Sequence, residues 1–389
     1  MKKVYFDHIS NTPVLPDVIE AMLPYFSKAF GNPQSQHGWG KEASSAIEHA
    51  RESVSKLINA KSEEIFFTGS ATESNNLALK GVVQALKNRG RHIISTPIEH
   101  LSILHPLKSL QKEGVEVTFL PVDHQGVISP EDVKKSIRED TILVSIIHGN
   151  NEIGTIEPIE QISKITRGRG VYLHTDASAT MGLISLDVEA LGVDLLTGSS
   201  QTLYGPKGVG VLYMRRGTRV RPIIEGGTQE HGKRSGTENV PAIVGFGKAA
   251  ELAQKDMDSR LEVLVRLRDR IKLEIERKVE ALVSTGSWVH RLPHHCSWCV
   301  KLIEGATLLS TLGEIGIGAS SGSACSSQAL RPSGVLSAIG IPEDLSKSSL
   351  VLSVGIGNTD EEVDFLVKEF PPLVKKLREM SPDYREMKR

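Results

Sequence analysis

The sequence is poor in cysteine and in aromatic residues, and it has no excess of charge of either sign. Its 389 residues include three cysteines and 5% aromatic residues, with 46 lysines and arginines against 47 aspartates and glutamates. So few cysteines in so long a chain exclude a disulfide framework, so each is a buried thiol, a metal ligand or a reactive group. Because no surplus of positive charge exists to release counterions, we expect no nucleic-acid partner and no attraction to an anionic membrane.

Long apolar runs are also missing. No run approaches the roughly 18 to 20 residues that a membrane-spanning helix needs. Residues 1–7 contain two lysines but lack the apolar stretch of a secretory signal. We therefore expect a soluble cytoplasmic protein. At roughly 100 to 200 residues per domain, the length predicts two domains or one large domain with an appendage.

Short, apolar, β-branched runs alternate with amphipathic stretches through the first two thirds of the chain. This alternation predicts an α/β domain, and apolar residues on both faces of each run are typical of parallel strands covered by helices. The expected strands are 65–68, 92–96, 116–120, 142–147, 172–176, 195–198 and 210–213. The expected helices are 42–58, 73–88, 102–112, 130–137 and 159–167.

The last third of the chain predicts a smaller α+β unit. Leucine and isoleucine at three- and four-residue spacing predict a charged amphipathic helix over 257–279 that bridges the two parts. Beyond it we expect two strands, 296–302 and 350–354. The final helix is expected over 360–380. We expect a large α/β domain over residues 14–256 and a small α+β domain built from 1–13 together with 257–389.

A turn rich in small and hydroxyl residues joins the first expected strand to a helix. This segment, 68–73 (TGSATE), puts free backbone N–H groups and two hydroxyls at a helix N-terminus, where a phosphate is favoured. A capped turn without a ligand explains the same residues. The glycine-rich turn 205–210 leads into a strand rather than a helix, so we interpret it as structural.

Two side chains follow expected strands at positions where ligands bind in open α/β sheets. Asp176 ends the strand 172–176, and an aspartate there can pair with a protonated pyridinium nitrogen. His100 comes soon after the strand that ends at residue 96, and its ring can stack on a flat cofactor. A capping aspartate and a structural histidine are the alternatives, and position alone does not decide between them.

Cys325 lies among small and hydroxyl residues, in the segment 318–327 (GASSGSACSS). Such a sequence leaves a thiol on a solvated, movable loop, which favours a reactive cysteine over a structural one. The segment 294–299 (HHCSWC) resembles half of a zinc site, but no second cysteine pair follows it. Residues 296 and 299 of a strand face opposite sides, which favours two packed thiols over a shared metal.

Taken in order, the motifs resemble those of the NifS and IscS cysteine desulfurases, in the class V aminotransferase family of fold type I pyridoxal phosphate (PLP) enzymes. The matching segments are 32–37 (NPQSQH), 70–76 (SATESNN), 99–100 (EH), 148–155 (HGNNEIGT), 176–177 (DA), 204–208 (YGPKG), 234–239 (RSGTEN) and 321–325 (SGSAC). The resemblance covers essentially the whole chain. It implies a homodimer whose large domain has a mostly parallel seven-stranded sheet.

The resemblance also implies roles for individual residues. Contacts with PLP would come from Ala71, Thr72 and Ser199 at the phosphate, with Thr237 of the partner subunit, and from His100, Asp176 and Asn151 at the ring. His100 and Cys325 would be catalytic. Cys325 would take sulfur from L-cysteine as a persulfide and pass it to an iron-sulfur scaffold protein of the IscU or NifU type, or to another acceptor.

Four positions around this expected site depart from the family. Thr202 stands where the family has the lysine that bonds PLP, and Gln201 replaces the histidine before it. Ala179 replaces a glutamine that bonds the cofactor, and Val351 replaces the arginine that binds the substrate carboxylate. Threonine cannot form an imine, and the acid-base help lost with the lysine is worth about 100- to 10,000-fold. Losing the charge-assisted bond of the arginine costs about 1.5 to 3 kcal/mol.

Three hypotheses follow. The protein is a cysteine desulfurase in which free PLP or another base, such as His100, replaces the lysine poorly. Or it is a homologue without that activity, in which Cys325 carries sulfur or ligates iron or an iron-sulfur cluster, since soft thiolate suits both. Or it is a PLP or pyridoxamine phosphate enzyme of altered chemistry on an amino-acid-like substrate. We expect sulfur mobilisation for iron-sulfur assembly, and the substitutions argue against an intact desulfurase activity.

Overall fold

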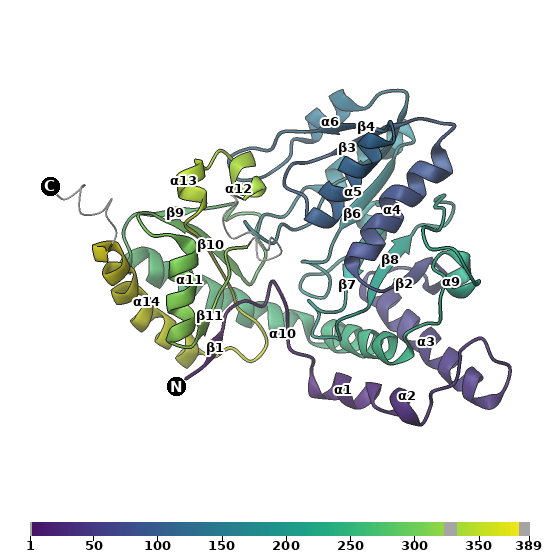
Figure 1. The fold of residues 1–389 in the computed structure, drawn as a ribbon, viewed down its shortest axis with the longest axis horizontal. Coiled ribbons are helices and arrows are strands. Elements are labelled where there is room, and N and C mark those ends of the chain that lie inside the picture. The colour runs from purple at the N-terminus through teal and green to yellow at the C-terminus, as the bar shows by residue number, and fades with distance from the viewer. Residues whose placement is uncertain (1, 323–332, 381–389) are drawn as a thin grey trace.

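A seven-stranded sheet forms the centre of the larger part of the molecule (Figure 1). The computed structural model describes residues 2–322 and 333–380, so Cys325 lies outside the described residues. The strand order is β2-β8-β7-β6-β5-β3-β4, and β8 runs antiparallel to both of its neighbours while the other pairs are parallel. The strands are β2 (Ile65–Thr68), β3 (His92–Ser95), β4 (Glu116–Phe119), β5 (Thr141–Ser145), β6 (Tyr172–Asp176), β7 (Leu195–Ser199) and β8 (Gly210–Met214).

These strands confirm the predicted α/β class and the mostly parallel seven-stranded sheet. All seven lie within two residues of the expected bounds, because short β-branched runs flanked by turns are a local signal. The expectation of strands buried on both faces is wrong for β4. It is one of the two edge strands of the sheet, its residues are exposed or half-buried, and Phe119 at its end is 38% exposed.

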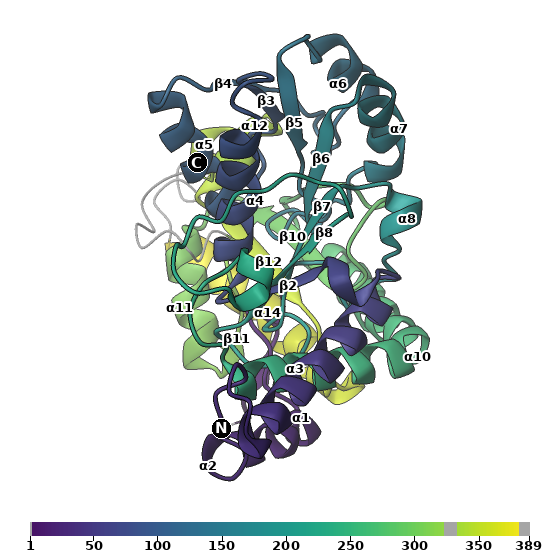
Figure 2. The ribbon, with the colours of Figure 1, turned by 90° about the vertical axis from the view of Figure 1, so that its right-hand side faces the viewer.

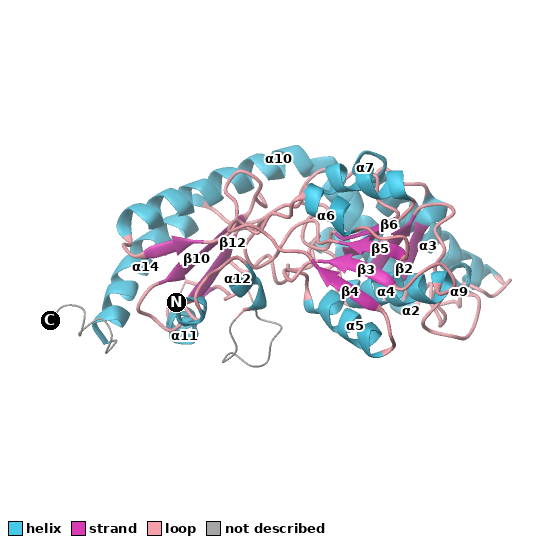
Figure 3. Ribbon diagram, turned by 90° about the horizontal axis from the view of Figure 1, so that it is seen from above, coloured by secondary structure: helices cyan, strands magenta, loops and turns pink. Residues whose placement is uncertain are grey.

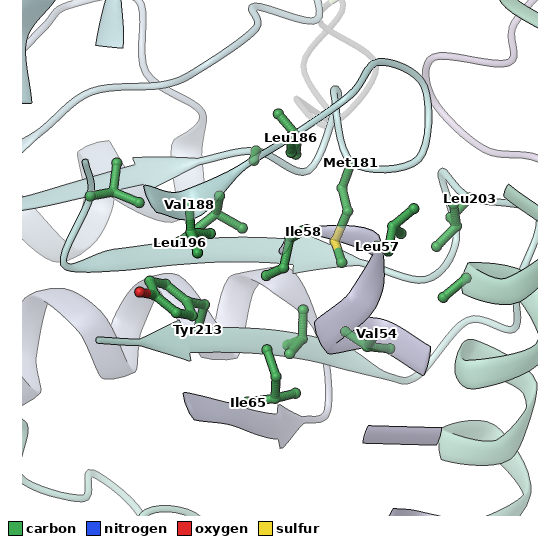
Figure 4. Close-up of a cluster of buried hydrophobic side chains, with 14 of the residues drawn as sticks. Val54, Leu57, Ile58, Ile65, Met181, Leu186, Val188, Leu196, Leu203 and Tyr213 are labelled. Carbon is green, nitrogen blue, oxygen red and sulfur yellow. The ribbon is translucent and has the colours of Figure 1, made fainter. Parts of the chain in front are cut away.

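Helices cover both faces of the sheet (Figure 2). On one face, α4 (Ala71–Leu86) and α5 (Leu101–Lys112) pack in a cluster that includes Phe66 of β2. On the other face, α3 (Gly38–Leu57), α7 (Ile159–Arg169) and the start of α10 (Val240–Lys278) pack around Phe67. Figure 4 shows part of this second cluster, where Tyr213 and Leu196 of the sheet lie near Ile58. Successive strand residues point to opposite faces, so each strand contributes to both layers.

A single long helix, α10 (Val240–Lys278), runs along both parts of the molecule (Figure 3). The helix predicted over 257–279 is therefore wrong at its start. Glycine lowers helix propensity, and Gly245 and Gly247 hide the first half of the helix from a periodicity argument. Tertiary packing requires them: a Cβ atom on Gly247 would lie 2.5 Å from the Cα atom of Ala50 in α3.

A second core lies at the other end of α10. It joins the helix to a three-stranded antiparallel sheet of order β12-β10-β9, to a short parallel pair of β1 and β11, and to α14. Their bounds are β1 (Val4–Tyr5), β9 (Leu282–Ser284), β10 (His295–Val300), β11 (Ile317–Gly318), β12 (Ser349–Ser353) and α14 (Asp360–Met380). The predicted final helix is confirmed, and both expected strands are present with shifted ends.

The remaining elements are short. They are α1 (Pro16–Met22), α2 (Pro24–Ser27), the 3-10 helix η1 (Ser62–Glu64), α6 (Pro130–Ser136), α8 (Val188–Leu191), α9 (Gln229–Gly232), α11 (Gly305–Glu314), α12 (Gly334–Ala338) and α13 (Glu343–Ser346). Across residues 2–322 and 333–380, no helix is both long and apolar enough to span a membrane.

Candidate functional site

A cavity of about 320 Å³ lies at the carboxyl ends of the parallel strands. Segments that follow β2, β3, β5, β6 and β7 meet there, as does the start of β8, because β8 runs in the opposite direction. This edge of an open α/β sheet is where ligands bind. The sequence-predicted residues that line the cavity are Ala71, Thr72, His100, Asn151, Asp176 and Ser199.

The phosphate end predicted from the sequence is the N-terminus of α4. Ser70 caps the helix, since its Oγ accepts the N–H of Glu73 at 3.2 Å. The Glu73 carboxylate accepts the Gly69 N–H at 2.9 Å and pairs with Arg234 at 2.9 Å, which fixes the turn from both sides. The first turn of a helix has N–H groups without intrahelical partners, so α4 directs a partial positive charge at the cavity.

Asp176 ends β6 with its carboxylate held on both oxygens. Oδ1 accepts the Ser178 N–H at 3.0 Å and the Ser178 hydroxyl at 2.5 Å, while Oδ2 accepts the Asn75 side-chain amide at 2.7 Å. The Asn75 amide also donates to Ser102 Oγ at 2.8 Å. The carboxylate is thus fixed in direction by neutral partners, with no cation among them to neutralise it.

The same network fixes His100, the N-cap of α5. Its Nδ1 accepts the Ser102 N–H at 3.1 Å and lies 2.7 Å from Ser102 Oγ. The same Oγ accepts a hydrogen bond from the Asn75 side-chain amide. Because Nδ1 accepts, the neutral ring carries its proton on Nε2. His100 and Asp176 are therefore coupled through Ser102 and Asn75, which sequence reasoning missed. Neither lies next to a strand end, and only the fold reveals them.

A buried carboxyl group belongs to Glu99, the residue that precedes His100. Burial raises the pKa of Glu99 from 4.5 to about 8, because the charged form loses its hydration. Its Oε1 accepts the Thr96 hydroxyl at 2.7 Å and the Ile147 N–H at 3.0 Å, whereas its Oε2 has no partner among the described residues. The raised pKa favours the protonated, uncharged form of Glu99 at neutral pH.

Asn151 joins the cavity to the segment that precedes Cys325. Its side-chain amide donates to the Gly322 carbonyl at 3.2 Å, and its own carbonyl lies 3.0 Å from His295 Nε2. Thr237 lies elsewhere: it is exposed in the segment before α10 and does not line this cavity. Of the predicted cofactor-binding residues, Thr237 alone is therefore not brought to the site within one chain.

Thr202 lines the cavity at the position where the lysine was expected. Its hydroxyl donates to the Ser178 carbonyl at 2.7 Å. Lys207 offers no replacement, because its Nζ donates to the Thr12 carbonyl at 2.9 Å and it does not line the cavity. The interpretation of the turn 205–210 as purely structural is wrong in part, since Gly208 and Val209 form cavity wall.

The two described cysteines are buried and inert. Cys296 packs in the core along α10, whereas Cys299 packs on the other side of β10 with Ile98 and Ile153, so the predicted opposite orientation is confirmed. Burial raises the pKa of each thiol to about 12, which disfavours the nucleophilic thiolate. Within the described part of the chain, no three histidine, cysteine or carboxylate side chains form a metal-binding group.

Comparison with known proteins gives the family. Residues 4–366 match the aminotransferase class-V family. The chain is 47% identical to the cysteine desulfurase IscS of Dictyoglomus turgidum, over 100% of this chain and 98% of that protein. It is 50% identical to the cysteine desulfurase IscS 1 of Archaeoglobus fulgidus, over 98% of this chain and 99% of that one. The chain belongs to the aminotransferase class-V family.

Solved structures of this class-V family agree. A NifS-like protein superimposes with a TM-score of 0.91 at 37% identity, covering 97% of this chain and 100% of that one. A NifS-like protein from Rickettsia africae gives a TM-score of 0.86 at 29% identity, covering 96% and 100%. The resemblance to the NifS and IscS cysteine desulfurases that the motifs indicated is thus confirmed over the whole fold.

PLP is the cofactor of class-V aminotransferases, so its fit to this cavity can be tested. The N-terminus of α4 suits a phosphate, the fixed Asp176 carboxylate suits a pyridinium nitrogen, and a cavity of about 320 Å³ falls in the range of small-ligand sites. No described lysine reaches the cavity to bond an aldehyde. The described residues therefore fit PLP as a non-covalent ligand.

Proposed function

We propose that this protein binds PLP non-covalently and acts in sulfur mobilisation for iron-sulfur cluster assembly, with Cys325 as its functional thiol. The observation that carries the first part is the intact network from His100 through Ser102 and Asn75 to Asp176, beside a cavity wall in which Thr202 replaces the lysine. A site that had merely decayed would not keep both ring-facing groups fixed.

In this proposal, each retained residue has a physical role. Ala71, Thr72 and Ser199 hold the phosphate at the helix N-terminus, and Asp176 holds the ring nitrogen in its protonated form. His100 lies against the ring and, with its proton on Nε2, presents a donor rather than a base on that atom. When bound, PLP supplies an electron sink for carbanion chemistry.

Sulfur mobilisation is supported by the relatives, which are named cysteine desulfurases, and by the inertness of the other two thiols. Cys325 takes the sulfane sulfur of a persulfide donor, and the donor leaves as its thiolate, so the exchange needs no added oxidant. The acceptor is an iron-sulfur scaffold protein of the IscU or NifU type. A ligand role for Cys325 toward iron or a cluster is part of the same proposal.

We further propose a cytoplasmic homodimer in which Thr237 of one subunit completes the phosphate site of the other. Two features support it. Thr237 is exposed and outside its own cavity, and Phe26, Phe30 and Trp39 are each more than half exposed around α2 and the start of α3. Exposed aromatic residues gathered in one region are typical of an interface, and a second copy is the occupant proposed here.

The experiment that tests this function compares sulfide release with sulfur transfer. The purified protein is given L-cysteine, PLP and a reducing thiol, and we expect no release above that of free PLP. Loaded from a persulfide donor, it should pass sulfur to a scaffold protein. Cys325→Ser should abolish the transfer, whereas Cys299→Ala should retain it because that thiol is buried. Unchanged transfer by Cys325→Ser, or cysteine turnover that depends on Cys325, would contradict the proposal.

A second candidate is a PLP or pyridoxamine phosphate enzyme of altered chemistry, acting on an amino-acid-like substrate. The cavity with its preserved polar residues favours it, because a carrier of sulfur alone has no need of a cofactor site. Consumption of an added amine or amino acid by the PLP-loaded protein, unchanged in Cys325→Ser, would separate this candidate from the first.

A further inference from the structure

The wall of the cavity that faces the second core is apolar. Ile9 and Ala179 line the cavity there, and Leu292 and Val351 pack directly behind them in one buried cluster. Ile9, Leu292 and Val351 are at most 7% exposed. The four residues come from the N-terminal segment, the turn after β6, the loop before β10 and strand β12, and we name them the apolar wall.

Two glycines bring this wall up to the cavity surface. Gly149 and Gly322 both line the cavity. A Cβ atom on Gly322 would lie 3.1 Å from Val351 Cγ2, and one on Gly149 would lie 2.9 Å from Leu292 Cδ2. The side chains of Val351 and Leu292 therefore point at the backbone that bounds the cavity. Both side chains therefore pack behind the cavity rather than on its surface.

Within the described part of the chain, no positively charged side chain lines this cavity beside the apolar wall. Among the described residues that line the cavity there is no lysine and no arginine, and the acidic one is Asp176. A carboxylate placed against the apolar wall would lose its hydration without gaining an ion pair, which is costly. It would also share the cavity with the Asp176 carboxylate, and like charges in one cavity repel.

We propose that the cavity selects amines that lack an α-carboxylate, and that the apolar wall is the determinant of this specificity. The ligand class is a small primary amine whose carbon next to nitrogen carries hydrogen or an apolar group. The inference rests on the proposed cofactor site, because it assigns the substrate end of the cavity whose other end holds PLP. It also sharpens the second candidate function from an amino acid to an amine.

The test uses two stable ligands that differ by one carboxylate. N-(5′-phosphopyridoxyl)-ethylamine and N-(5′-phosphopyridoxyl)-L-alanine share the phosphate, the ring and a methyl group, and binding of each to the full chain is measured by calorimetry. We expect the ethylamine conjugate to bind at least about 10-fold more tightly, since a buried unpaired charge costs more than one tenfold step in affinity. This comparison needs no variant.

Val351→Arg should reduce or invert the preference, and Val351→Leu, the matched apolar control, should keep it. Equal or tighter binding of the alanine conjugate by the unaltered chain would overturn the inference while leaving the cofactor site in place. If pyridoxamine 5′-phosphate and both conjugates all fail to bind, the proposed cofactor site is wrong. The inference, which rests on that site, is then wrong as well. Pyridoxamine 5′-phosphate binding thus separates the two kinds of failure.

Discussion

The cavity has a polar end, formed by Asp176 and His100, and an apolar wall. The two regions differ in composition and in the interactions that fix their side chains. At the polar end, Asp176 and His100 keep fixed directions through hydrogen bonds to Asn75 and Ser102. At the apolar wall, Ile9, Leu292 and Val351 pack through apolar contacts. Hydrogen bonds are directional and apolar contacts are not, so the two ends restrict a ligand in different ways.

The difference also bears on how the chain diverged from its class-V relatives. Ala179 and Val351 pack in the same cluster, although they are far apart in sequence. Both positions carry apolar side chains here, where the resemblance implies a glutamine and an arginine. The two substitutions therefore make one side of the cavity apolar together.

The largest expected effect comes from placing a lysine side chain between the polar end and the apolar wall. Thr202→Lys should convert PLP from a non-covalent ligand into a covalent one, because residue 202 lines the cavity beside the small Ala179. Borohydride reduction followed by mass spectrometry of the intact chain measures the attachment, with Thr202→Met as a control of similar length. If the Thr202→Lys protein binds PLP but mass spectrometry detects no covalent attachment, the polar end and the apolar wall do not meet at residue 202.

A smaller loss should follow from neutralising the polar end. Asp176→Asn removes a charged acceptor while keeping the side-chain size, and we expect pyridoxamine 5′-phosphate to bind about 10- to 100-fold more weakly, as for a lost charge-assisted hydrogen bond. Calorimetry measures the change. Asp258→Asn on the exposed part of α10 is the control and should bind normally. If both variants bind alike, the polar end does not hold the ring nitrogen.

The smallest effect concerns the buried carboxyl group of Glu99, the residue before His100. The pKa of Glu99 is raised from 4.5 to about 8, so the folded chain holds a proton that the unfolded chain releases between these values. This contribution to stability is complete below pH 4.5 and is lost as the pH rises through about 8. Glu99→Gln keeps the acceptor for Thr96 and Ile147 but does not titrate.

Urea unfolding at several pH values measures the free energy of unfolding for both proteins. We expect it to fall less steeply with rising pH in Glu99→Gln than in the unaltered chain. Glu157, whose pKa is also raised to about 8, is present in both proteins and cancels in the comparison. Parallel curves would show that the Glu99 carboxyl is already ionised in the folded chain near neutral pH.

Local signals in the sequence determined most of the fold and a part of the cavity. Apolar runs of strand length, each followed by a turn, located β2 to β8 within two residues. Asp176 and the turn that begins α4 were found because parallel strands place their carboxyl ends at one edge. These predictions succeed because they depend on residues that are neighbours along the chain.

Tertiary structure alone decided the rest. The start of α10 depends on the contact of Gly247 with Ala50, and the direction of Asp176 depends on Asn75, which belongs to a different element. The apolar wall needs four distant segments to meet before Val351 becomes a neighbour of the cavity. Periodicity and spacing indicate the secondary structure that each segment prefers. Packing decides which distant residues share a surface, and in this proposal that surface selects the ligand.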